Sequence, residues 1–167
     1  QYPAAPVGNS LRQAAALIKA QLGTRCIFVD VNGAFDTHAN QLAQNELEFS
    51  RLGPALAAFA RDLGPRLDEV TLFVTTEFGR TASVNGSGGT DHGSGHCMIL
   101  LGAGVRGGRV HGRWPGLSSP QLFENRDLAV TTDYRDAFSE VARAALGVDA
   151  GALFPGYAGG PPPGAVS

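Results

Sequence analysis

Three short runs of apolar residues constrain the fold of this chain more than any other feature of the sequence. They are RCIFVDV at 25–31, VTLFVTT at 70–76 and CMILLG at 97–102. Each run is continuously apolar and does not alternate with polar residues, a pattern that favours strands covered on both faces. The sequence therefore predicts three buried strands.

Segments with helical periodicity lie before, between and after these runs. Apolar residues at helical spacing predict helices over about 11–22, 39–63 and 133–147. Asn9 or Ser10 is the expected cap of the first helix, and the last has Asp133 near its start and Gly147 as its C-cap. Pro54 follows Gly53 inside the second of these segments, and we expect a kink or a division there. Helices that alternate with strands in this order are typical of an α/β fold, with a mostly parallel central sheet flanked by helices.

The two ends of the chain have a different character from its middle. The first residue is Gln1, and the segment that follows it has the character of a connection, so we interpret the chain as a processed or partial product. Residues 151–167 are rich in proline and glycine, which predicts an extended or disordered tail. The expected folded domain is therefore 1–150.

Composition and charge exclude several classes of partner. Thirteen basic and fifteen acidic residues give a net charge of −2, and no Lys/Arg cluster provides the basic stripe that nucleic-acid binding requires. No apolar run approaches the roughly 20 residues of a membrane span. Cys26 and Cys97 each lie inside an apolar run, which predicts buried thiols, with a disulfide between them as the open alternative.

Two Asp/His pairs follow predicted strands. Asp36 and His38 come after the first strand, and Asp91 and His92 stand in a glycine-rich stretch after the second. In α/β folds, ligands bind at the carboxyl ends of the strands, so we expect the two pairs to meet. Four nitrogen and oxygen ligands suit Zn²⁺ best, with Mn²⁺, Mg²⁺ and Ca²⁺ as alternatives. Either pair alone also fits a solvated turn.

Other polar residues near the same predicted edge have roles that the sequence leaves open. Glu77 closes the second strand and could bind the metal, hold a histidine, or form an ion pair with Arg80. Arg80 could instead bind the anionic oxygen of a substrate. His96 is a further candidate ligand or a simple strand-edge residue, whereas His111 lies in a segment where a solvated side chain is the better interpretation.

Several blocks of the sequence resemble one known family. The blocks are NGAFDTHANQ, TLFVTTEFGRTASVNGSGGTDHGSGHCMILLGAGVRGG, GRWPGL and LAVTTDYRDAFSEVARAALGVD. They are similar to the DUF1501 family, a group of bacterial proteins placed in the alkaline phosphatase and sulfatase superfamily. The resemblance runs from about Tyr2 to Asp149. It implies an alkaline phosphatase-like fold, of which this chain would be the C-terminal half.

The resemblance also implies a site and a cellular location. It supports Asp36, His38, Asp91 and His92 as metal ligands, although the spacing of Asp36 and His38 is shorter than the superfamily pattern. It implies that the nucleophile lies in an N-terminal half, and that members are exported. A catalytic residue is not identified within this chain.

Two functions from different classes follow from these observations. The first is a metal-dependent hydrolase that acts on small phosphate or sulfate esters and pairs with its N-terminal half or with a second copy. The second is an exported protein without catalytic activity that keeps the ion for a structural or assembly role. A flavodoxin-like or Rossmann-like domain has the same order of elements, but the sequence carries no matching glycine fingerprint.

Overall fold

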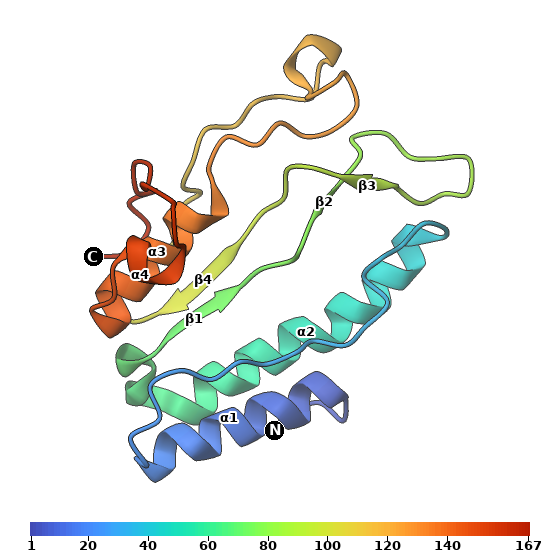
Figure 1. Cartoon of the computed structure of the whole chain (residues 1–167). Helices are drawn as coiled ribbons and strands as arrows, with labels where there is room; N and C mark the ends of the chain where they lie inside the picture. Colours follow the sequence, from blue (N-terminus) through green and yellow to red (C-terminus); the bar gives the residue numbers. More distant parts are fainter. The chain divides into compact units, whose positions relative to one another are not determined.

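The computed structural model describes residues 1–167, which divide into two compact units (Figure 1). Unit 1 consists of residues 1–67 together with 84–90. Unit 2 consists of residues 68–83 together with 91–167. The chain therefore passes from unit 1 to unit 2, returns for one short segment, and then completes unit 2.

Unit 1 is built on two helices that pack against each other, α1 (Pro6–Ala20) and α2 (Gln41–Leu63). Figure 1 shows them side by side in blue and cyan. Ala15 of α1 and Ala55 of α2 are fully buried, so small side chains let the two helices approach closely. The other buried apolar residues of this core are Val7, Leu11, Ala14, Leu52, Ala58, Phe59 and Leu63.

Both helices were predicted from the spacing of apolar residues, but their ends differ from the prediction. α1 starts at Pro6, ahead of the predicted capping residues, because the fixed φ of proline suits the first helical position. α2 continues through Pro54, so the predicted division of this helix is wrong. Leu52 and Ala55, on either side of the proline, are both buried.

The first predicted strand does not form. Residues 25–31 belong to neither sheet, and the Phe28 side chain is 86% exposed. Cys26 is an exposed free thiol, and so is Cys97 in unit 2, so the prediction of buried cysteines is wrong. The residue types in this segment favour a strand, but a strand is stable only when a neighbour pairs with its backbone.

Unit 2 contains two small antiparallel sheets. β1 (Thr71–Val74) pairs with β4 (Ile99–Gly102), and β2 (Gly79–Arg80) pairs with β3 (His92–Gly93). The predicted mostly parallel central sheet is therefore wrong, and an alkaline phosphatase-like fold is not supported. The chain between β1 and β4 turns back on itself, and this reversal makes both pairings antiparallel.

In unit 2, α3 contacts β1 within a cluster of aromatic side chains. α3 (Tyr134–Leu146) starts at Asp133, whose carboxylate accepts a hydrogen bond from the Arg135 N–H, and ends at Gly147 in the left-handed conformation, as predicted. Phe138 of α3 lies with its ring centroid 4.4 Å from that of Phe73 in β1. Phe154, which follows the short helix α4 (Ala150–Leu153), completes the cluster. Two 3₁₀ helices, Gly64–Glu69 and Ser119–Gln121, connect other elements.

The proline- and glycine-rich tail is held against α3 by two carboxylates. Asp136 accepts hydrogen bonds from the Tyr157 hydroxyl and the Gly160 N–H, at 2.7 and 2.6 Å. Glu140 accepts the N–H groups of Gly164 and Val166. The tail is thus extended but bound to unit 2. None of the helices combines the length and the apolar character needed to cross a membrane.

The core between α1 and α2 gives a direct test of unit 1. Leu63→Ala should lower the free energy of unfolding by about 2–5 kcal/mol, because the change removes buried methyl groups and leaves a cavity. Leu42 lies on the same helix but is 85% exposed, so Leu42→Ala is the matched control and should cost less than about 0.5 kcal/mol. Urea denaturation followed by circular dichroism measures both values, and equal losses would contradict this core.

Candidate metal centre

The loop that precedes α2 presents two ionisable side chains on either side of a buried threonine. The Phe35 ring packs edge-on against Phe49 of α2, with 5.9 Å between ring centroids, and the Thr37 N–H donates to the Phe35 carbonyl. Thr37 is buried, whereas its neighbours Asp36 and His38 are exposed. The loop therefore buries Thr37 and exposes the carboxylate and the imidazole on either side of it.

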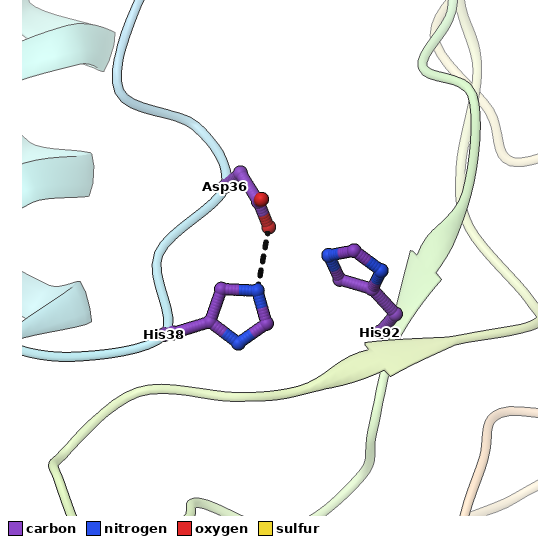
Figure 2. Close-up of side chains that lie close together, drawn as sticks. All are labelled: Asp36, His38 and His92. Carbon is purple, nitrogen blue, oxygen red and sulfur yellow. Dashed lines mark ion pairs between the residues drawn. The ribbon is translucent and has the colours of Figure 1, made fainter.

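Asp36 and His38 form an ion pair (Figure 2). The His38 Nε2 atom lies 3.1 Å from the Asp36 Oδ1 atom, and both side chains are about half exposed. Two neighbouring ligands of a tetrahedral ion with bonds of about 2.0–2.1 Å would lie about 3.3 Å apart. The spacing of these two atoms therefore fits two ligands of the same ion.

A tight turn in residues 85–90 is bound to this loop within unit 1. The Thr90 N–H donates to the Thr37 carbonyl at 3.1 Å, and the Asn85 side-chain amide donates to the His38 carbonyl at 3.0 Å. The side-chain oxygen of Asn85 also accepts a hydrogen bond from the Gly89 N–H, which shapes the turn. Gly89 lies against the His38 backbone with no space for a side chain. The turn thus holds the loop backbone at Thr37 and His38.

His92 belongs to β3 in unit 2, where aromatic and cationic side chains surround it. It faces Arg80 across the ladder between β2 and β3. The Phe78 ring stacks on the His92 imidazole with 4.1 Å between centroids and 28° between planes. The Arg80 guanidinium lies 5.5 Å from the centroid of the same Phe78 ring. Gly93 packs on the Arg80 backbone, so a larger residue at that position would separate the two strands.

A buried carboxylate holds the strand that carries His92. Asp127 accepts a hydrogen bond from the Ser94 hydroxyl at 3.0 Å and two from the Arg126 guanidinium, at 2.8 and 3.3 Å. On the other side of His92, the Thr81 N–H donates to the Asp91 carbonyl at 3.0 Å. Both ends of this short strand are therefore fixed.

The environment of Asp127 keeps its carboxylate ionised. Burial alone would raise the pKa of this group, because a buried charge loses hydration. The hydrogen bonds from Arg126 and Ser94 favour the ionised form and outweigh burial, so the pKa is below its ordinary value of 3.8. The stabilisation that these bonds provide therefore depends on pH in the acid range.

The residues predicted from the sequence as metal ligands do not all belong to one set. The chain offers one group of three candidate ligands, which consists of Asp36, His38 and His92. Asp91 is exposed and lies outside this group, and its backbone binds Thr81 instead.

Glu77 and His96 are also outside the group of three. The His96 Nδ1 atom lies 3.0 Å from the Cys97 carbonyl, which occupies one of its ring nitrogens. The His111 Nε2 atom is bound in the same way to the Arg106 carbonyl. These two histidines are thus engaged with local backbone.

Sequence reasoning missed two residues that shape the surroundings of the ligands, Phe78 and Asn85. Asn85 is followed by Gly86, and this dipeptide is a recognised turn signal. Phe78 stands two residues before Arg80, the spacing that places two side chains on the same face of a strand. Both signals were present, but neither indicates which partner the side chain contacts.

Comparison with known proteins gives one match. A family model described as "Protein of unknown function (DUF1501)" matches residues 8–157, which is most of the chain. No curated protein and no solved structure matches. The match thus agrees with the resemblance found in the sequence blocks, but it brings no activity with it.

The Asp127 contacts predict a pH-dependent stability. Because the pKa of Asp127 is depressed in the folded state, its stabilisation is present above the ordinary value of 3.8 and is lost as pH falls through the lower folded value. Asp127→Asn removes the charge, so unfolding free energies of this variant should fall less steeply below pH 4 than those of the wild type. Urea denaturation from pH 2.5 to 7 measures the difference, and parallel curves would contradict the argument.

Proposed function

The chain belongs to the DUF1501 family, and because the description of that family assigns no function, we propose from its own side chains that it binds one divalent metal ion. The ligands are Asp36, His38 and His92. One carboxylate and two imidazoles are a donor set that suits Zn²⁺, and three protein ligands leave a fourth position open, as in catalytic zinc sites.

The hydrogen bond between Thr90 and Thr37 carries this proposal. Thr37 stands between the two ligands of the first loop, and Thr90 stands two residues before His92. Consecutive Cα atoms are 3.8 Å apart, so the Cα atom of His92 lies within about 7.6 Å of that of Thr90. Two peptide bonds therefore connect His92 to Thr90, which is hydrogen-bonded to the residue between Asp36 and His38.

We propose further that the bound ion serves the hydrolysis of phosphate or sulfate esters. The ion would act as a Lewis acid toward an ester oxygen. Arg80 faces His92 across the ladder. Its guanidinium can bind two oxygens of an anionic ester through two parallel hydrogen bonds. The open position on the ion and the neighbouring guanidinium support this reaction class, and we propose that an N-terminal half of the same protein supplies the nucleophile.

Metal affinity tests the ligand set. His92→Gln, His38→Gln and Asp36→Asn should each weaken Zn²⁺ binding by at least about 100-fold, because loss of a residue that only orients a ligand already costs about 10–100-fold. His111→Gln is the control, since His111 is engaged with backbone outside the set. Isothermal titration after treatment with a chelator measures the affinities. Unchanged binding in all three ligand variants would refute the site.

Anion binding tests the proposed reaction class. The metal-loaded chain should bind inorganic phosphate, and Arg80→Gln should weaken that binding more than Arg80→Lys, because glutamine removes the charge as well as the fork of donors. In protein that includes the upstream half, aryl phosphate or aryl sulfate should be hydrolysed only with metal present. Tight metal binding without turnover of any such ester would favour the alternative, an exported metal-binding protein without catalysis.

A further inference from the structure

The two strands that carry Arg80 and His92 bring three side chains to one face. Arg80 and His92 are register partners, so their side chains point to the same side of the β2–β3 ladder. Phe78 precedes Arg80 by two residues, which places its side chain on that side as well. The distances agree, because the Phe78 ring lies 4.1 Å from the imidazole and 5.5 Å from the guanidinium.

We infer that Phe78 is a positioning residue that fixes the orientation of the His92 imidazole for metal binding. This inference rests on the proposed metal site. Phe78 itself offers no donor atom and touches no ion. It acts through His92, by stacking on one face of the imidazole, whose two nitrogens lie in the plane of the ring.

The conformational freedom of the His92 side chain affects the free energy of metal binding. His92 is exposed on a strand of two residues, and its stack on Phe78 reduces the number of rotamers open to the imidazole. Ordering such a side chain costs about 0.5–1.5 kcal/mol when a ligand binds. A stacked partner restricts the imidazole before the ion arrives. The residues that orient metal ligands act in this way and tune the affinity.

Arg80 reinforces the arrangement from the same side of the ladder. A guanidinium near an aromatic ring is attracted by the negative charge of the ring face. Its contact with Phe78 therefore restricts the motion of that ring and, through the ring, of the imidazole. The three side chains form one packed group in which Phe78 is the shared element.

Metal affinity of Phe78 variants tests the inference. Phe78→Leu keeps an apolar side chain but removes the ring, and it should weaken Zn²⁺ binding about 10–100-fold. Phe78→Tyr keeps the ring and should restore the wild-type affinity. Phe123→Leu is the matched control, since Phe123 is half exposed in the same unit and has no place in the ligand group. Urea denaturation of each variant shows that it is folded.

A second measurement separates the stacking from the metal site. In the metal-free protein, the His92 ring protons should show upfield NMR shifts caused by the stacked ring in the wild type and in Phe78→Tyr, but not in Phe78→Leu. If the wild type binds Zn²⁺ but lacks the shift, or if Phe78→Leu binds as tightly as wild type, the positioning role is refuted alone. If the shift is present but the wild type binds no ion, the proposed function fails and the positioning role fails with it.

Discussion

The hydrogen bond from the Thr90 N–H to the Thr37 carbonyl is the constraint on which the candidate site depends. It joins two segments that are more than fifty residues apart in sequence, and it does so directly beside Asp36 and His38. Asn85 strengthens the same connection through the His38 carbonyl. The loop and the turn therefore hold each other in place within unit 1. The chain leaves unit 1 after Thr90, two residues before His92.

Local sequence patterns predicted the helices of this protein well. The apolar spacing of α2 and the two caps of α3 depend on neighbours within a few residues, and such signals can be read without knowing the fold. The Asp36 and His38 pair was also predicted from its position after an apolar run. The proline and glycine content predicted an extended or disordered tail. The two α3 carboxylates that bind it were not foreseen.

The pairing of the strands could not be predicted in the same way. Residues 25–31 have strand composition, but the backbone partner that a strand requires is a property of the whole fold. The reversal of the chain between β1 and β4 depends on the β2–β3 ladder and on the anchoring of β3 by Asp127. The sequence predicted both Asp91 and His92 as ligands, whereas the candidate group contains only the histidine. That difference depends on the pairing of β3, which the sequence does not reveal.

X-ray absorption spectroscopy of the Zn²⁺-loaded protein tests the central claim most directly, because it reports which atoms surround the ion. We expect a first shell of nitrogen and oxygen at about 2.0–2.1 Å, with the outer scattering of two imidazoles. A sulfur atom at about 2.3 Å would instead assign the ion to the exposed thiols of Cys26 or Cys97. That result, or scattering from fewer than two imidazoles, would contradict a site made by Asp36, His38 and His92.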